Sequence, residues 1–258
     1  MTTSLLPILR IADFNTKGLI GPATAGTPFH SLVKSSGVSK KDSEASGGSF
    51  GIGKNAVYSL SDLQTVFYST VYRNTEDGAL TFLAQGKSVL VSHTDREGTS
   101  RRATGYWGEP NFQPINDPSR APKWLRRDEV GTTVFAIGFR EAGGWKERMA
   151  ASLIQNFFSA IHREDMELYV GDELIIDSKS ISSLFADPRI QDAATQTISN
   201  DEFAFSKYLY ECLTSSEAFA EEIQVEHLGG VRVRVLVRAG LPKRVTLTDG
   251  SCHFHHNG

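Results

Sequence analysis

The sequence has few cysteines, no long hydrophobic run and almost no net charge. Only Cys212 and Cys252 occur among 258 residues, so a disulfide framework is not expected and a reducing cytoplasm is the default compartment. No apolar run approaches the ~20 residues of a membrane span, and the N-terminus lacks the pattern of a signal peptide. A formal net charge of −3 excludes the strong positive charge that indicates binding to nucleic acid or membrane surfaces. We therefore expect a soluble cytoplasmic protein with no membrane partner.

Against this background, the most informative feature is a glycine-dense segment at residues 47–56, which reads GGSFGIGKNA. Glycines let backbone N–H groups approach a ligand without a Cβ in the way. A helix that begins at Lys54 would add unpaired N–H groups and a partial positive charge, which suit a phosphate. The segment therefore predicts a phosphate site. The alternative is an ordinary loop followed by a helix start.

Three nucleotide-binding motifs compete for this segment. A P-loop needs Ser or Thr after its lysine, whereas Asn55 follows Lys54 here. A Rossmann turn over Gly51 to Ala56 needs a buried strand directly before it, and residues 39–46 are polar. The third motif is a glycine box that follows a flexible lid, and only this one predicts the polar residues upstream.

The upstream residues add a carboxylate at the end of a strand. Residues 7–12 are short, apolar and β-prone, and Asp13 follows them. A carboxylate there can accept a hydrogen bond from the exocyclic amine of adenine, although an aspartate in this position, taken alone, is more often a turn former or helix cap. The residues from about 20 to 47 are rich in Gly, Ser, Thr, Lys and Pro, so we expect them to be either disordered or a ligand-gated lid.

Downstream, the pattern predicts alternating helices and strands. We expect a strand opened by Gly131-Thr132-Thr133 and an irregular insertion at about 94–129 that contains Tyr106 and Trp107. The expected helices are 54–62 and 144–162, and the expected strands are 64–72, 79–83, 88–93 and 134–139.

In its order of motifs, the chain from about residue 5 to 176 resembles the GHKL ATPase superfamily, which includes gyrase, the large heat-shock chaperone, histidine kinases and MutL-type repair proteins. The resemblance implies that Asp13 reads adenine and that the Thr132 hydroxyl supports it, directly or through water. Asn15 and Gly18 stand where the family has a tighter Asp-x-Gly-x-Gly turn. The implied phosphate contacts are Gly48, Gly51, Gly53 and Lys54.

The resemblance also implies ATP and Mg²⁺ as cofactors, but the family's catalytic helix is not found. That helix precedes the first strand and carries a general-base Glu and, four residues on, a magnesium-binding Asn. Only Met1 to Leu6 precede the expected strand, and no Asn has Glu four positions before it. The sequence is therefore a fragment of a longer protein, which we favour, or a non-hydrolysing relative. Either way, we expect nucleotide binding without turnover.

Residues 177–258 predict a smaller C-terminal α/β module. Helices are expected at 178–185 and 201–213, and strands at 222–226, 231–237 and 244–247. Arg232, Arg234 and Arg238 alternate with valines, which indicates either a face for phosphate or nucleic acid or, as we favour, a solvated sheet face. Four tail residues could ligate a metal, but a disordered or truncated end is the favoured interpretation; they are Cys252, His253, His255 and His256.

Together these patterns predict an α/β protein, more narrowly an α+β two-layer sandwich of the Bergerat type, with a mixed, largely antiparallel sheet backed by helices. Residues 1–176 would form the ATP-binding domain and 177–258 a transducer-like module. The expected function is an ATP-dependent conformational switch that binds ATP or ADP and forms a nucleotide-dependent homodimer. The alternative is a non-catalytic scaffold whose insertion binds a protein or DNA partner.

Overall fold

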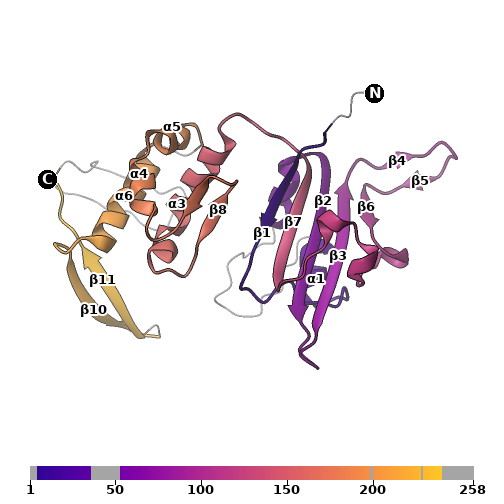
Figure 1. Ribbon diagram of the computed structural model, residues 1–258, viewed down its shortest axis with the longest axis horizontal. Helices are drawn as coiled ribbons and strands as arrows, with labels where there is room; N and C mark the ends of the chain where they lie inside the picture. The colour runs from indigo at the N-terminus through magenta and orange to yellow at the C-terminus, as the bar shows by residue number, and fades with distance from the viewer. Residues whose placement is uncertain (1–4, 36–52, 198–199, 228, 240–258) are drawn as a thin grey trace. The chain divides into compact units, whose positions relative to one another are not determined.

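The computed structural model describes residues 5–35, 53–197, 200–227 and 229–239 of this chain (Figure 1). The chain divides into two compact units, Met1–Glu141 and Ala142–Gly258. Both contain helices and strands, so the protein is mixed α/β. The division falls earlier than the boundary expected at residue 176, because α3 (Trp145–His162) shares a hydrophobic core with the helices that follow it.

The first unit is built on one five-stranded sheet with the order β1-β7-β2-β3-β6. Every neighbouring pair is antiparallel, whereas the sequence predicted a mixed, largely antiparallel sheet. The ladder between β1 and β7 continues past the end of β1, since the Asp13 N–H donates to the Thr132 carbonyl at 2.9 Å. The strands are β1 (Ile8–Ala12), β2 (Ser61–Arg73), β3 (Leu80–Val89), β6 (Thr104–Trp107) and β7 (Gly131–Phe139).

Two expectations for this sheet were wrong. The segments 79–83 and 88–93 were expected as separate strands, but the single strand β3 runs from Leu80 through Val89, and His93 belongs to the short strand β4 (His93–Thr94). Gly86 continues the strand because the ring of Phe67 fills the space of a side chain, and a Cβ there would lie 2.7 Å from that ring. Tyr106 and Trp107, expected in an irregular insertion, form the edge strand β6. The insertion also holds β4 (His93–Thr94), β5 (Ser100–Arg101), η1 (Pro110–Phe112), η2 (Pro118–Arg120) and η3 (Lys123–Leu125).

Helices α1 (Pro28–Val33) and α2 (Gly53–Ser59) cover one face of this sheet. The described part of the expected lid therefore contains a helix. Thr27 caps α1 by accepting the His30 N–H, Pro28 suits the first turn, and the apolar Phe29 and Val33 lie four residues apart on one side. The core beneath these helices consists of Ala23, Phe29, Val33, Tyr58, Val66, Tyr68, Tyr72 and Leu83.

The opposite sheet face packs against the insertion. Leu125 of η3 is fully buried there, and Phe67 contacts both Trp107 and Trp124 with ring centroids 5.3 Å apart. Trp107 and Trp124 remain 38% and 46% exposed. The core on this face consists of Val71, Phe82, Ala84, Ile115, Ala121, Leu125, Phe135 and Ile137.

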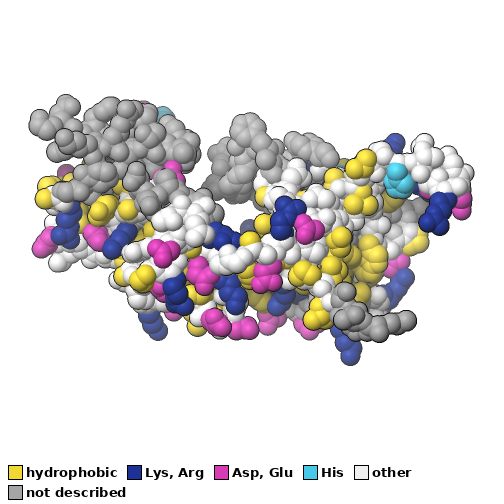
Figure 2. Space-filling view, turned by 90° about the horizontal axis from the view of Figure 1, so that it is seen from above, with side chains coloured by type: hydrophobic (Ala, Val, Ile, Leu, Met, Phe, Trp, Pro, Cys, Tyr) yellow, Lys and Arg dark blue, Asp and Glu magenta, His cyan; other side chains and the backbone are white. Residues whose placement is uncertain are grey.

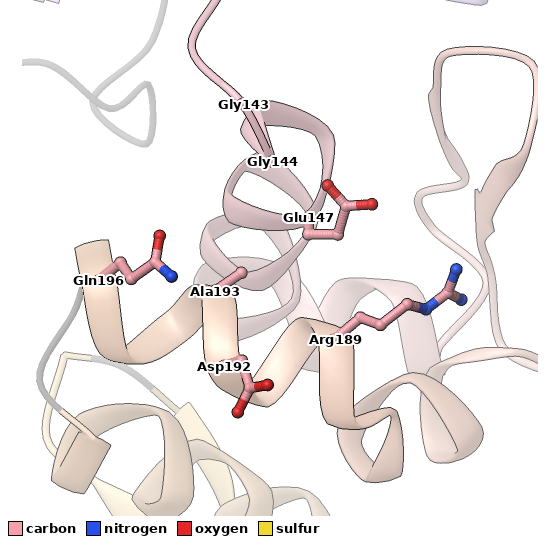
Figure 3. A pocket seen from close by; sticks show the side chains of 7 residues that line it. All are labelled: Gly143, Gly144, Glu147, Arg189, Asp192, Ala193 and Gln196. Atoms are coloured by element: carbon pink, nitrogen blue, oxygen red, sulfur yellow. The ribbon is translucent and has the colours of Figure 1, made fainter.

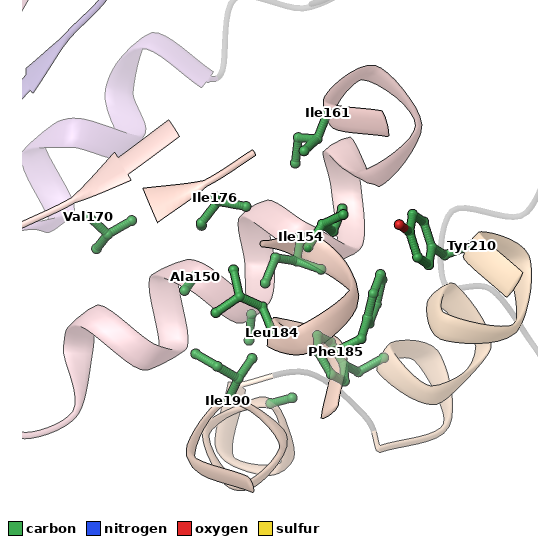
Figure 4. Packing of buried hydrophobic residues seen from close by; sticks show 13 residues of the cluster. Ala150, Ile154, Ile161, Val170, Ile176, Leu184, Phe185, Ile190 and Tyr210 are labelled. Carbon is green, nitrogen blue, oxygen red and sulfur yellow. The ribbon is translucent and has the colours of Figure 1, made fainter. Parts of the chain in front are cut away.

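The second unit is a helical cluster with two small hairpins. Its core gathers side chains from α3, α4 and α6, among them Ile154, Phe185 and Tyr210 (Figure 4). An additional helix, α5 (Pro188–Thr197), was not expected from the sequence. The remaining elements are β8 (Leu168–Val170), β9 (Leu174–Ile176), α4 (Ile181–Ala186), α6 (Asn200–Thr214), β10 (Phe219–Val225) and β11 (Gly229–Val235).

The hairpin of β10 and β11 contains two of the three alternating arginines. Arg234 donates to the Cys212 and Ser215 carbonyls at 3.0 and 2.7 Å, so it joins the hairpin to the C-terminal end of α6. Arg232 lies opposite Glu222 in the ladder. These contacts give Arg234 a structural role. The expected strand 244–247 and the tail residues 252–256 lie outside the described residues.

Charged groups are distributed evenly over the visible surface. Figure 2 shows Lys and Arg side chains interspersed with Asp and Glu, in keeping with the net charge of −3. Within the described part of the chain, no helix combines the length and apolar character needed to span a membrane.

Candidate functional site

Asp13 and Thr132 lie side by side at one end of the sheet. The Thr132 backbone N–H donates to Asp13 Oδ1 at 2.8 Å, and the Thr16 hydroxyl donates to the same oxygen at 2.6 Å. No residue in the described part of the chain donates to the other carboxylate oxygen, Oδ2, and Asp13 is exposed. One oxygen thus orients the carboxylate, while Oδ2 remains an acceptor with no donor among the residues that the structure describes.

The support from Thr132 differs from the expected one. The resemblance implied that the Thr132 hydroxyl supports Asp13, but the hydrogen bond to Asp13 comes from the Thr132 backbone N–H. Its hydroxyl lies 3.5 Å from the Thr70 hydroxyl instead. A backbone donor fixes the carboxylate whatever side chain stands at position 132.

Thr70 of β2 is a site residue that the sequence analysis missed. Its fully buried hydroxyl accepts the Leu19 N–H at 2.8 Å and donates to the Gly131 carbonyl at 2.9 Å. It therefore links the turn after β1 to the start of β7. A threonine inside a β-prone strand is so common that nothing in the local sequence marks it.

The turn from Asp13 to Gly18 places two further expected residues beside this pair. Gly18 has φ +69°, and an added Cβ would run into the Val71 carbonyl, so only glycine fits without strain. Asn15 also has positive φ, at 57°, and is exposed in the same turn. The structure thus brings Asp13, Gly18 and Thr132 together, with Asn15 at the rim.

Arg127 holds the turn and β7 together and was also missed by the sequence analysis. It is only 7% exposed, and its guanidinium lies 4.7 Å from the centre of the Phe14 ring. Burial lowers the pKa of Arg127, while the neighbouring Asp13 opposes that shift. The acceptors of its hydrogen bonds are the carbonyls of Asp13, Glu129, Val130 and Thr132 and the hydroxyl of Thr133.

The glycine-dense segment is described only at its end. Gly53 opens α2 and is exposed, and nothing lies within 4 Å of a Cβ added there, so contacts with the described residues do not require glycine. Lys54 Nζ donates to the Ser31 carbonyl of α1 at 3.2 Å. Gly48 and Gly51 lie outside the described residues, so their expected contacts stay predictions.

A cavity of about 360 Å³ lies in the second unit, between the start of α3 and α5 (Figure 3). Its charged lining is mixed, with Glu147, Asp192 and Arg189. Arg189 is already paired with Asp187 at 2.8 Å and is largely exposed. An anion at the helix start would meet two carboxylates, so we do not choose this cavity as the functional site.

No group of three or more His, Cys, Asp or Glu side chains within the described residues could hold a metal ion. The comparisons with known proteins found no match: no family model, no curated protein and no solved structure matches this chain. The structure itself shows a mixed α/β fold with a five-stranded antiparallel sheet.

Proposed function

We propose that the first unit binds an adenine nucleotide beside Asp13 and that the protein is a nucleotide-dependent conformational switch of GHKL type. The observation that carries this proposal is the oriented Asp13 carboxylate, with Oδ1 held by two donors and Oδ2 facing no donor among the described residues. The exocyclic amine of adenine is a donor that suits such an oxygen.

Three further features support the proposal. Helices on one face of an antiparallel sheet agree with a two-layer sandwich of the Bergerat type. Gly18 and Gly131 keep side chains away from the Asp13 turn, since a Cβ on Gly131 would lie 2.7 Å from Asp13 Oδ1. Lys54 stands at the beginning of α2, after the glycine-dense segment, where a phosphate can meet helix N–H groups.

Titration calorimetry with a non-hydrolysable ATP analogue and Mg²⁺ tests this proposal. We expect saturable heat with a Kd below about 1 mM, corresponding to at least ~4 kcal/mol of binding free energy. The matching GTP analogue is expected to bind roughly tenfold more weakly, because its O6 is an acceptor that faces the Asp13 carboxylate. Absence of saturation, or equal affinity for both bases, would contradict adenine recognition at Asp13.

A second candidate function is a scaffold whose insertion binds a partner. The observation in its favour is the pair Trp107 and Trp124, which remain partly exposed although both pack on Phe67. Partly exposed aromatic side chains are common anchors of protein interfaces.

Limited proteolysis separates the two candidates. For the switch, we expect the ATP analogue to slow cleavage within residues 31–46 several-fold, because ligand binding to the native state lowers the population of opened states. Cleavage within residues 94–129 serves as the internal control and is expected to stay unchanged. Unchanged cleavage of both segments together with tight binding of a partner would support the scaffold.

A further inference from the structure

A row of side chains crosses the five-stranded sheet on the face that packs against the insertion. Its members lie opposite one another in the ladders of β6, β3, β2, β7 and β1, which are neighbours in Figure 1. In that order they are Trp107, Gly86, Phe67, Phe135 and Arg10. Residues directly opposite one another in antiparallel strands share a face. Because the Phe67 ring occupies the space over Gly86, the aromatic side chains form a continuous strip, here called the aromatic strip.

Trp124 of η3 adds a fourth ring to the aromatic strip. Its ring centroid lies 5.3 Å from that of Phe67 and 5.2 Å from that of Phe135. Phe135 is 5% exposed, whereas Trp107 and Trp124 are 38% and 46% exposed. The buried ring therefore supports an indole that stays accessible to a ligand. Side chains fixed by packing before a ligand arrives lose little conformational entropy when it binds.

The two tryptophans are close enough to contact one short ligand together. Each has its ring centroid 5.3 Å from that of Phe67, so the two indoles are separated by no more than twice that distance. Their planes are inclined to the Phe67 ring by 58° and 73°. The aromatic strip thus offers two accessible indoles with a ring between them.

Three exposed cations border the aromatic strip. Arg10 ends the row on β1, and Lys123 and Arg126 stand on either side of Trp124 in the chain. None of the three forms an ion pair with a carboxylate in the described part of the chain. Arg126 donates to two backbone carbonyls, which orient its guanidinium without neutralising it. These charges favour an anionic ligand and repel the cations that aromatic rings can also bind.

Aromatic rings beside cations match the chemistry of unpaired nucleic acid bases. Every base has a flat face that can stack on an aromatic side chain, and in a single strand that face is accessible. The bases of a duplex already stack on one another, and a neutral sugar chain would gain nothing from the cations. The net charge of −3 does not oppose this ligand, because stacking is independent of the charge of the whole protein.

We propose that the aromatic strip binds single-stranded nucleic acid, with bases stacked on Trp107 and Trp124 and with phosphates beside the three cations. This inference rests on the second candidate function, the scaffold, for which it names the partner. The adenine site at Asp13 takes no part in it. Because stacking does not read the edges of the bases, the binding is expected to show little sequence preference.

Fluorescence anisotropy of a labelled oligothymidylate of about 12 nucleotides, titrated with the full chain, tests the inference. Thymine lacks the exocyclic amine proposed to contact Asp13, so this probe does not report on the adenine site. We expect saturable binding, and roughly tenfold weaker binding of the matching duplex. Trp107→Leu and Trp124→Leu should each weaken binding roughly tenfold, since each removes a stacking surface. Phe219→Leu removes an exposed ring from the second unit and should change nothing.

Two further measurements leave the aromatic strip intact. In a Trp145→Phe background, oligothymidylate is expected to quench the fluorescence of Trp107 and Trp124, as stacked bases do. Arg10→Met and Lys123→Met alter only exposed side chains. Each should flatten the slope of log affinity against log salt concentration by about 0.7, the contribution of one phosphate contact on a single strand. The exposed Lys179→Met makes the same charge change in the second unit and should leave the slope unaltered.

The outcomes separate this inference from the proposed functions. Absence of saturable binding, equal affinity for the duplex, or unchanged affinity in both tryptophan variants with native circular dichroism would overturn it. Binding of a protein partner that depends on both tryptophans, without binding of oligothymidylate, would also overturn it, although the scaffold candidate would stand. Binding of the ATP analogue bears only on the adenine site, so the two proposals can fail separately.

Discussion

Replacement of Arg127 with methionine is expected to lower the free energy of unfolding of the first unit by about 3 kcal/mol or more. The guanidinium contacts four backbone carbonyls and the Thr133 hydroxyl, and it is 7% exposed. Methionine fills a similar volume but donates no hydrogen bond, so these acceptors lose their partner in a place that water reaches poorly. Lysine keeps the charge but not the planar fork, and we expect it to recover only part of the loss.

Urea unfolding of the full chain, followed by tryptophan fluorescence, measures this effect. The protein has three tryptophans, so a Trp145→Phe background leaves Trp107 and Trp124 of the first unit as reporters. Arg126→Met is the matched control, because Arg126 is exposed and its hydrogen bonds to the described residues go to the Ala121 and Ser119 carbonyls. We expect it to cost less than about 1 kcal/mol. Equal midpoints for the two variants would show that Arg127 does not hold the turn to β7.

The contrast between these neighbours shows what local sequence could predict. Residues 120–127 contain four positively charged side chains. Judged from the sequence alone, each is equally compatible with a solvated loop. Arg127 differs from the others because it donates hydrogen bonds to carbonyls in the turn after β1 and at the start of β7. These two segments meet only when β1 pairs with β7. Thr70 was missed for the same reason, since its partners are residues 19 and 131.

Elements with strong local signals were predicted well. β1, β7 and α3 occur within about two residues of the expected bounds, because their apolar patterns and flanking glycines act locally. The bounds of β3 were predicted wrongly because the contact that makes Gly86 compatible with a strand comes from Phe67 on β2, which is distant in the sequence. A signal for α5 was present, since Asp187 accepts the Arg189 N–H directly before a helix that begins with Pro188.

The candidate site, too, could be predicted from the sequence only in part. The sequence marked Asp13, Gly18 and Thr132 through residue types that suit a strand end and a turn, and the structure places them together. It could not show that Thr132 acts through its backbone, because any residue at that position carries the same N–H. Mutagenesis of the Thr132 side chain is therefore a weaker test of the site than a change at Asp13.

The substitution Asp13→Asn is expected to reverse the base preference of the site. Asn keeps one oxygen, which can still accept the Thr132 N–H and the Thr16 hydroxyl that Asp13 Oδ1 accepts at 2.8 and 2.6 Å. Its Nδ2 then stands in place of Oδ2 and presents a donor to the donor amine of adenine. ATP is expected to lose roughly tenfold to a hundredfold in affinity, as when a charged hydrogen bond is lost, whereas the O6 of GTP can accept from Nδ2.

Calorimetry with ATP and GTP analogues on Asp13→Asn and on Asp128→Asn measures the reversal. Asp128 is exposed and makes no hydrogen bond to the described residues, so its substitution makes the same charge change without altering the turn. We expect the ratio of GTP to ATP affinity to rise only in Asp13→Asn. A parallel loss for both bases would mean that Asp13 supports the turn without contacting the base, because loss of structure weakens every ligand alike. An unchanged ATP affinity would place the nucleotide elsewhere, since a base that contacts Oδ2 cannot be indifferent to its replacement by a donor.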